Sequence, residues 1–508
     1  MSEPNNEIRP LLQRARQAQS SGNSIAALAL LYRALTIKPS EDEAAHYVGV
    51  HLSEGGTHDL AVRWIARSIV LQQSNPLYWL NQAIALQKIK DFDRALQSLK
   101  RSSSIDDISW KTYLNFGHVY RETKHRAEAV HAYEKSLCIN PGYSPTYEHL
   151  SFVYDHVLLL EKRVRSLELA KILTPDNIDV CFSLGLYSLM MGRFAEGWDL
   201  LEYRWVASHA ADNPNYSKRL ITSRPAFTGE ESHGRIFIWS EQGIGDEIMF
   251  CSTLADFLRK YPLRVILQVD ERLAPLIERS FPKVQVVRRG TILDEDLYDC
   301  HLPFGSLPRL LRRSEGSFES GRSPFLKASP DRVRLFRDRL SAGGRPIVGL
   351  SWWSSNGALR CIPLRDLITS LDGTNVTLVN LQYGNHSKEI EDVSQALSRQ
   401  VFDFDEVDCL EDMEGLAALL ECCDLVVSVA NTTVHLAGAL GRPTIALLPY
   451  FPGWRWLNNG NRCLWYDSVC LLRQDVLGDW GNVLGQIATA IDRLCEGRGA
   501  GSVLRELD

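Results

Sequence analysis

The stretch that decides the fold of the first two fifths of this chain is Trp110–Pro141, WKTYLNFGHVYRETKHRAEAVHAYEKSLCINP. Its Gly117, Ala129, Tyr133 and Pro141 each belong to a series of similar residues whose spacings are multiples of 34. These series are Ala27, Ala61, Ala95, Ala129; Gly49, Ala83, Gly117, Ser151, Gly185; Leu52, Leu86, Tyr120, Tyr154; Leu31, Ile65, Leu99, Tyr133, Leu167; and Pro39, Pro141, Pro175. Agreement of five registers over one stretch indicates an internal repeat.

The period and its small, bulky and proline positions resemble the tetratricopeptide repeat, a helix-turn-helix unit. Small residues suit the crossing of two close helices, and proline ends the second helix because it cannot continue it. We count about five repeats from Glu7 to Asn177 and a partial sixth to about Trp205. Such arrays stack into a superhelix with a concave face. We expect this α-helical superhelix to hold a partner protein, and the alternative is a scaffold or dimerisation module.

The remainder of the chain alternates short apolar runs with helical patterns, which predicts α/β domains with parallel sheets. The expected strands are 235–239, 264–269, 284–287, 346–350, 376–381, 424–429 and 444–448. A segment rich in Arg, Ser and Gly, 311–330, separates two such series. We therefore predict a repeat domain at 1–207 and two Rossmann-like halves, at 208–342 and 343–508, with a cleft between these halves. Open α/β sheets bind ligands beyond the carboxyl ends of their strands.

Composition narrows the classes of function. The 508 residues carry a formal net charge of -6, which argues against a dedicated nucleic-acid binder. No apolar run reaches the length of a membrane span, and the polar N-terminus does not resemble a signal peptide. The eleven cysteines show no Cys-x-x-Cys pair and no zinc-type spacing. We expect a cytoplasmic protein whose thiols are reduced and mostly buried.

The first candidate motif follows the strand at 235–239 and reads SEQGIGDE, residues 240–247. Gly243 and Gly245 would let the backbone approach a ligand closely where the strand turns into a helix. Asp246 would lie in the first helical turn, where a carboxylate can take a proton from an attacking hydroxyl. The alternative is that Asp246 only caps the helix.

Two further motifs follow strands of the last half. Ser351, Trp352, Asn356 and Arg360 come after 346–350, where they offer hydrogen-bond donors and a positive charge for phosphate. After 424–429, the run 431–435 (Asn, Thr, Thr, Val, His) opens a helix, whose amides and hydroxyls would seat a phosphate. The expected binding residues in this run are Asn431, Thr432, Thr433 and His435. Simple capping, an ordinary surface arginine and a core histidine are the alternatives.

A fourth motif, LLPYFPGWRWL at 447–457, places an aromatic cluster at the carboxyl end of the strand at 444–448. This cluster could stack a base or sugar, or could be a hydrophobic plug between domains. Two Asp-x-Asp matches, Asp294–Asp296 and Asp403–Asp405, are typical of metal–diphosphate sites elsewhere. We discount them because neither follows a convincing strand. The sequence predicts neither a metal site nor a bound cofactor.

In their order along the chain, these motifs resemble bacterial tetratricopeptide-repeat glycosyltransferases. The carrying segments are EQGIGD, GLSW with IPL, DLVVSV with HLAGALG, and LLPY with WRWL. Those proteins have a C-terminal GT-B domain similar to heptosyltransferases and share their plan with O-GlcNAc transferase. The resemblance implies metal-independent sugar transfer, with the nucleotide-sugar donor on the last half and the acceptor on the half before it. It also implies Asp246 as general base. Many relatives carry Asp-Thr-Ser where this chain has Ala430-Asn431-Thr432.

Three functions remain open on the sequence. The first is transfer to Ser or Thr of a protein acceptor docked on the repeats, with flagellin as the acceptor in some such fusions. The second is a lipopolysaccharide or small-molecule sugar transferase whose repeats only mediate assembly. The third is a catalytically degenerate adaptor, because the departure at Ala430-Asn431 removes a carboxylate. The sugar, the nucleotide, the acceptor and the oligomeric state do not follow from the residues.

Overall fold

A computed structural model describes residues 4–156, 159–208, 219–230, 233–340, 344–355 and 357–507. The chain divides into two compact units, Met1–Cys181 and Phe182–Asp508. In the described ranges, no helix has the length and apolar character needed to cross a membrane.

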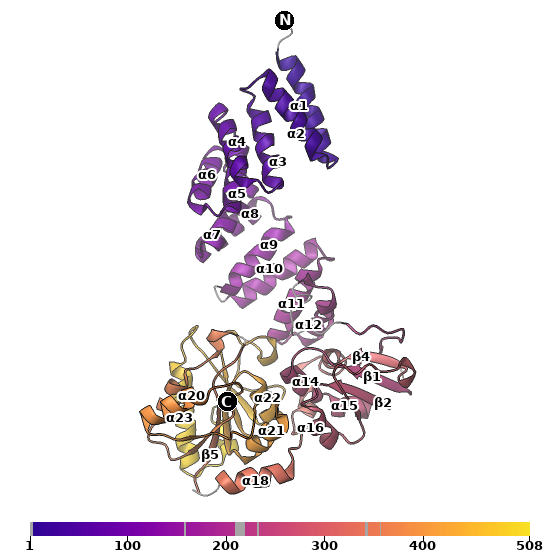
Figure 1. Cartoon of the computed structure of the whole chain (residues 1–508), viewed down its shortest axis with the longest axis vertical. Coiled ribbons are helices and arrows are strands. Elements are labelled where there is room, and N and C mark those ends of the chain that lie inside the picture. The colour runs from indigo at the N-terminus through magenta and orange to yellow at the C-terminus, as the bar shows by residue number, and fades with distance from the viewer. Residues whose placement is uncertain are drawn as a thin grey trace. The chain divides into compact units, whose positions relative to one another are not determined.

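The first unit is built from paired helices that follow one another along the chain (Figure 1). Their bounds are α1 Pro4–Ser20, α2 Ser24–Ile37, α3 Asp42–Glu54, α4 His58–Leu71, α5 Pro76–Lys88, α6 Phe92–Ile105, α7 Trp110–Glu122, α8 Arg126–Ile139, α9 Ser144–His156 and α10 Leu160–Leu173. A further pair, α11 (Ile178–Met190) and α12 (Phe194–Leu201), continues the pattern. The predicted repeat superhelix is confirmed.

The two strongest repeat registers meet in space. A Cβ placed on Gly49 of α3 would lie 2.5 Å from Cγ1 of Ile65 on α4. A Cβ on Gly117 would overlap the ring of Tyr133 in the same way. The small residue of the first helix therefore leaves room for the bulky residue of the second, 16 positions later. This contact is the physical reason for the two series with the same 34-residue period.

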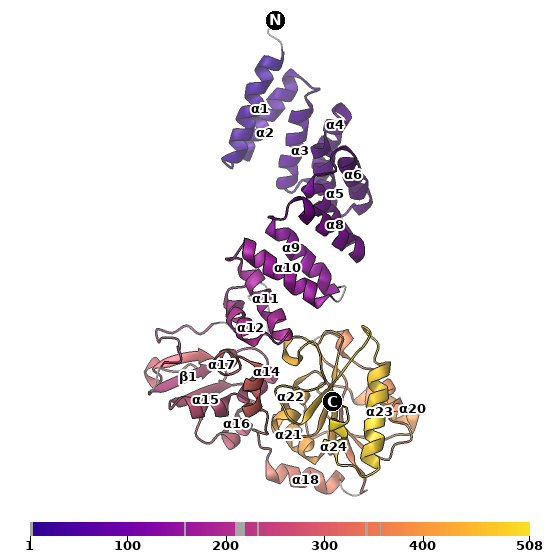
Figure 2. The same ribbon diagram turned by 180° about the vertical axis from the view of Figure 1, so that it is seen from behind.

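The second unit contains two parallel sheets, as predicted for an α/β GT-B plan (Figures 1 and 2). The first has the strand order β3-β2-β1-β4. Its elements are β1 Arg235–Trp239, α14 Ile244–Cys251, α15 Leu254–Lys260, β2 Arg264–Val269, α16 Ala274–Ser280, β3 Gln285–Arg288, β4 Cys300–Pro303 and α17 Leu307–Leu311. The strand β4 was not predicted.

The second sheet has the order β10-β9-β8-β5-β6-β7. Its elements are α18 Pro330–Leu340, β5 Ile347–Ser351, α19 Leu364–Thr369, β6 Thr377–Asn380, α20 Ser387–Leu397, β7 Val401–Phe402, α21 Met413–Cys422, β8 Leu425–Val429, α22 Thr432–Ala439, β9 Thr444–Leu448, β10 Val469–Arg473, α23 Gly481–Cys495 and α24 Ala500–Arg505. The edge strands β7 and β10 were not predicted. The helix α18 lies in the segment assigned to the preceding half, but it packs on α21 through the Arg332–Asp412 ion pair.

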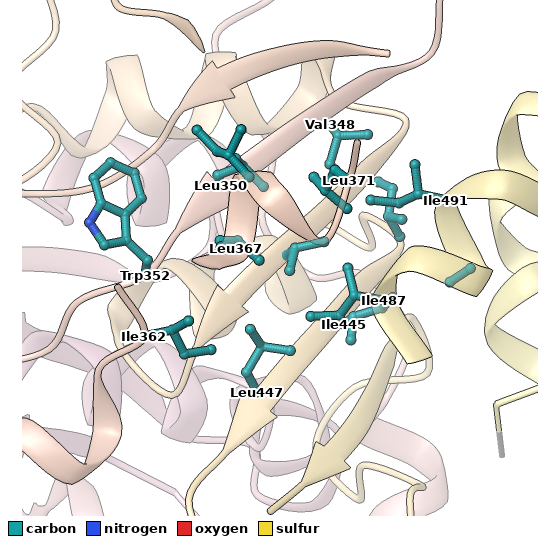
Figure 3. Close-up of a cluster of buried hydrophobic side chains, with 14 of the residues drawn as sticks. Val348, Leu350, Trp352, Ile362, Leu367, Leu371, Ile445, Leu447, Ile487 and Ile491 are labelled. Carbon is teal, nitrogen blue, oxygen red and sulfur yellow. The ribbon is translucent and has the colours of Figure 1, made fainter. Parts of the chain in front are cut away.

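A core cluster fills one face of the six-stranded sheet (Figure 3). Val348 and Leu350 of β5 belong to this cluster together with Ile487 and Ile491 of α23, and Figure 3 shows Val348 beside Leu371 and Ile491. Trp352 belongs to the same cluster and is only 1% exposed. Side chains alternate between the two faces of a strand, so residues 348, 350 and 352 point into this core. Gly349 and Ser351 therefore point to the opposite face.

The end of the repeat-like region is bonded into the four-stranded domain. Arg204, just after α12, donates from Nε and Nη2 to the two carboxylate oxygens of Glu241 at 2.8 and 2.7 Å. Both side chains are fully buried, and Glu241 also accepts from the amide of Gly305. Trp198 of α12 donates its indole N–H to the carbonyl of Arg312 at 2.8 Å. Helix α12 is therefore a structural part of the second unit.

Candidate functional site

A cleft of about 620 Å³ lies where the carboxyl ends of β1, β5, β6, β8 and β9 face each other. Its walls come from the segments that follow these strands, together with residues before α21 and Leu186 of α11. The sequence-predicted residues that line it are Gly243, Gly245, Asp246, Arg360, Asn431, Thr432, Thr433 and His435. Residues from both sheets thus meet in one cavity, which is the position expected for ligands of open α/β sheets.

Two helix N-termini converge in this cleft. Helix α14 begins after Gly243 and helix α22 after Asn431. A Cβ on Gly245 would lie 3.1 Å from Cδ2 of His435 and 3.5 Å from Oγ1 of Thr432. The absence of a side chain at Gly245 is what allows the two helix starts to touch. Each helix start carries partial positive charge and amides that favour an anion.

Asp246, the predicted general base, is paired across the cleft. Its Oδ1 accepts a hydrogen bond from Nε of Arg455 at 2.5 Å. Its side chain is 12% exposed and that of Arg455 is 29% exposed. Asp246 belongs to α14 beside the four-stranded sheet, whereas Arg455 comes from the turn after β9 of the other sheet. The carboxylate therefore does not act as a simple helix cap, because its partner is a side chain on the far wall.

The turn that carries Arg455 is held by aromatic side chains. The guanidinium lies over the ring of Trp454 at 4.6 Å, and Trp465 donates its indole N–H to the Arg455 carbonyl at 3.0 Å. Trp454 in turn meets Trp198 edge to face at 5.4 Å. Gly453 starts the turn with a φ of 87°, a conformation that favours glycine. Of the two interpretations of this motif, these contacts favour a hydrophobic plug. The plug also carries the Arg455 guanidinium, which lines the cleft.

Glu247, next to the candidate base, has a structural role. Its carboxylate is fully buried and accepts from Nη2 of Arg289 at 2.5 Å and from the amide of Asp270 at 2.7 Å. Burial raises the pKa of Glu247 to about 7, although Arg289 acts in the opposite direction. These contacts tie the start of α14 to the end of β2 and thereby fix the direction of Asp246.

Asn431 is occupied by internal hydrogen bonds. Its Oδ1 accepts from the amide of Thr433 at 3.0 Å, which caps α22, and from Oγ of Ser428 at 3.1 Å. Its Nδ2 donates to Oγ of Ser351 at 2.8 Å and to the carbonyl of Trp353 at 3.2 Å. The side chain of Asn431 therefore positions the start of α22 and the loop after β5. The next residue, Thr432, lines the cleft. Thr433 is buried.

His435 is buried and neutral at physiological pH. Burial lowers its pKa to about 4. Its Nδ1 lies 3.0 Å from the hydroxyl of Tyr466, and its ring stacks on Trp456 with centroids 4.9 Å apart. It thus forms part of the cleft wall as an uncharged ring. These surroundings are those of a core histidine, as the alternative to a binding role predicted, although the residue also lines the cleft.

The binding residues predicted in the segment after β5 lie in different environments, as far as the structure describes them. Ser351 is buried behind the cleft wall and donates to Oε1 of Gln382 at 3.0 Å. Trp352 lies in the hydrophobic core and does not line the cleft. Asn356 lies outside the described residues. Of the three that the structure describes, only Arg360 lines the cavity.

Gln382, at the end of β6, organises this loop and was not predicted. Its Oε1 accepts from Oγ of Ser351 and from the amides of Trp352 and Trp353, at 2.8 to 3.0 Å. A buried side-chain oxygen with three donors holds a loop firmly. The neighbouring Tyr383 lines the cleft. A polar residue directly after an expected strand was the available signal for both.

Arg360 gives the cleft uncompensated positive charge. In the described part of the chain, no carboxylate forms an ion pair with it. Burial and the nearby charge of Arg455 lower the pKa of its guanidinium below the usual value. The cleft therefore holds two arginines, one carboxylate and two helix starts, a combination that attracts an anionic ligand.

The cleft lining also includes apolar side chains. Cys409, Leu410 and Met413 line the cleft near the start of α21, together with Tyr383. The two Asp-x-Asp matches lie elsewhere: Asp296 pairs with Arg224, and Asp403 accepts from Asn380. Among the described residues, no group of three or more His, Cys, Asp or Glu is placed to hold a metal ion.

Comparisons with known proteins agree with this architecture. Residues 365–454 match the model of glycosyltransferase family 9 (heptosyltransferase), and residues 111–143 match a tetratricopeptide repeat. Protein FlbA of Caulobacter vibrioides is 27% identical over 497 residues, which cover 93% of this chain and 82% of that protein. Among solved structures, the Pseudomonas aeruginosa PilF protein is 19% identical and covers 40% of this chain and 90% of its own, with a TM-score of 0.36.

Proposed function

We propose that this chain, which combines tetratricopeptide repeats with a glycosyltransferase family 9 domain, transfers a sugar from a nucleotide-sugar donor to a hydroxyl of a protein acceptor. The observation that carries the proposal is the cleft itself. Asp246, Arg360 and the start of α22 line one cavity, although they come from three separate motifs. A carboxylate and an anion seat in one cleft are the two parts that such a transfer needs.

In the proposed reaction, the acceptor oxygen attacks the anomeric carbon of the donor sugar. The bond from that carbon to the phosphate oxygen breaks, and its electron pair leaves with the nucleotide diphosphate or monophosphate. The hydroxyl proton passes to the carboxylate of Asp246. Arg360, Arg455 and the amides at the start of α22 would stabilise the negative charge on the leaving phosphate, which is the role a metal ion has in other transferases.

The donor is assigned to the six-stranded half and the acceptor to the four-stranded half. Arg360 and Thr432 belong to the former and Asp246 to the latter, which supports this assignment. The apolar side chains of Leu410 and Met413, which line the cleft, offer a surface for the nucleotide base. The base, the sugar and the nucleotide remain to be identified by binding.

Docking of the acceptor protein, as distinct from entry of its hydroxyl into the cleft, is assigned to the repeats. Tetratricopeptide repeats suggest protein–protein interaction, and the repeat match at 111–143 supports docking of a protein whose Ser or Thr receives the sugar. Flagellin is the acceptor that the resemblance to repeat-containing transferases implies. The buried thiols of Cys251, Cys409 and Cys423 support a reducing compartment, so we place the reaction in the cytoplasm.

A second candidate is transfer to a carbohydrate acceptor. It is favoured by the description of the matching family as heptosyltransferase. The two candidates share the donor cleft and differ only in what supplies the hydroxyl.

A screen of nucleotides and nucleotide sugars by thermal shift on the full chain tests the proposal. Stabilisation by one nucleotide sugar is expected, because a ligand that binds the folded state raises its melting temperature. Mass spectrometry of a co-expressed flagellin should then show the mass of that sugar on Ser or Thr. Stabilisation without modification of any protein would favour the carbohydrate acceptor. No stabilisation by any nucleotide sugar would favour a catalytically degenerate adaptor.

A further inference from the structure

The candidate base and one of the two cleft arginines are bound to each other. Asp246 Oδ1 accepts from Arg455 Nε at 2.5 Å, and the pair joins α14 to the turn after β9. The contact is direct, with no water between the partners, and the carboxylate side chain is only 12% exposed. A carboxylate that accepts a charge-assisted hydrogen bond is less available to take a proton from a substrate hydroxyl.

Arg455 is also close to the anion seat. Its charge acts on Arg360, whose pKa is lowered by burial and by this neighbour. Two guanidinium groups and a single carboxylate thus share one cavity of about 620 Å³. A ligand with two negative charges would compensate both arginines, whereas Asp246 compensates only one.

We infer that Arg455 is a shared counter-ion, which binds Asp246 in the empty cleft and the phosphates of the donor in the loaded cleft. Donor binding then removes the guanidinium from Asp246 and makes this carboxylate available as the base. This inference rests on the proposed function and adds an order to it: the donor binds first, and the base is released only when phosphates occupy the cleft.

The turn that carries Arg455 suits such an exchange. Its backbone is anchored, because the Arg455 carbonyl accepts from Trp465 and the adjacent Trp456 stacks on His435. Arg455 has a long side chain with several rotatable bonds, which lines the cleft and is 29% exposed. The side chain can therefore change partners while the wall of the cleft keeps its place.

The alternative is that the ion pair is purely structural. The two hypotheses predict opposite changes in phosphate affinity when the charge of Asp246 is removed. If Asp246 and phosphate compete for Arg455, then removal of the carboxylate charge strengthens phosphate binding. If the carboxylate instead holds Arg455 in the position that phosphate needs, its removal weakens phosphate binding. Linkage requires that any competition disappears when Arg455 itself is absent.

The test is a double-mutant cycle on the full chain with Asp246→Asn, Arg455→Gln and both together. Titration calorimetry measures the affinity for inorganic pyrophosphate and for the uridine, adenosine, guanosine and cytidine diphosphates. Pyrophosphate reports the phosphate seat whatever base the site prefers. Asp405→Asn, an exposed carboxylate of the six-stranded half that does not line the cleft, controls for the general loss of one negative charge.

We expect Asp246→Asn to bind the probes several-fold more tightly and Arg455→Gln at least several-fold more weakly. In the Arg455→Gln background, Asp246→Asn should change affinity less than two-fold. Unchanged or weaker binding by Asp246→Asn, or the same gain in both backgrounds, would overturn the inference and leave the proposed function intact. If the wild-type chain binds none of the probes, the proposed function fails as well. Asp246→Ala repeats the cycle if the Asn variant does not fold.

Discussion

Gly245 at the start of α14 lies against His435 at the start of α22, so closely that an added Cβ would be 3.1 Å from the imidazole Cδ2. The glycine connects the two halves at the point where both helix starts face the cleft. The relationship explains why a Gly-x-Gly turn, a weak motif by itself, is required here. It gives the four-stranded and six-stranded halves a common wall at the cleft.

Gly245→Ala should therefore impair function more than stability. Alanine is favoured over glycine in a helix by about 1 kcal/mol, which offsets part of the strain. The new methyl group has to push His435 and Thr432 away, which widens the anion seat. We expect a melting temperature within a few degrees of wild type and a clear loss of nucleotide-induced stabilisation. Gly243→Ala, whose Cβ would meet only Asp246 Oδ2 at 3.7 Å, is the matched control.

Asp246→Asn and Asp246→Ala should abolish sugar transfer. Loss of a general base lowers the rate by about 10²- to 10⁴-fold, while the fold and the donor seat stay in place. Transfer is measured by the mass increment on the acceptor, and binding by calorimetry on the same preparations. Full activity in either variant would exclude Asp246 as the base.

Arg360→Ala should weaken nucleoside diphosphate binding by about ten- to a hundred-fold, the range for loss of a charge-assisted hydrogen bond. The physical reason is its position in the cleft without a carboxylate partner among the described residues. Arg360→Lys should recover part of the affinity, since the charge is kept and the planar fork is lost. Arg365→Ala, an exposed arginine on α19, should bind like wild type.

The buried ion pair of Arg204 and Glu241 predicts a stability effect without a direct role in chemistry. Arg204→Met leaves Glu241 buried without its counter-charge, which costs about 3–5 kcal/mol. Glu241→Gln should cost less, because Arg204 keeps its ion pair with Glu202. The melting temperature of the second unit should fall by several degrees, as measured by calorimetry. A fall of less than one degree in both variants would contradict the burial of this pair.

Acidification should destabilise the repeat unit. Burial lowers the pKa of His46 to about 4, of His118 to about 3 and of His149 to about 4, against 6.5 for an ordinary histidine. Above pH 6.5 these groups are neutral in both states and have no effect. As pH falls below 6.5, these histidines bind protons in the unfolded chain but stay neutral in the folded chain. The free energy of unfolding therefore decreases down to about pH 4.

The slope of unfolding free energy with pH measures this effect. Each histidine contributes at most about 1.4 kcal/mol per pH unit. Urea unfolding followed by circular dichroism between pH 7 and 4.5 should show the loss of unfolding free energy. His118→Gln should reduce its slope with pH by up to about 1.4 kcal/mol per pH unit, the contribution of one proton. An unchanged slope in that variant would contradict the lowered pKa of His118.

Local patterns in the sequence carried much of this architecture. The 34-residue period predicted the helix pairs because each repeat packs a small residue against a bulky one 16 positions later, as Gly49 does against Ile65. The apolar runs at 235–239, 264–269 and 444–448 became strands with the predicted bounds. The strand-end rule also brought Asp246, Arg360 and Thr432 to one cleft, although their roles stay predictions.

What tertiary structure decided was which side chains meet. The sequence by itself determined the period, the strands and the strand ends, because these follow from backbone geometry and from apolar spacing along the chain. The alternation of β5 sends Trp352 into the core and Ser351 toward Asn431, so neither lines the cleft. The pairing of Asp246 with Arg455 joins residues 209 positions apart, and only the packing of two domains brings them within 2.5 Å.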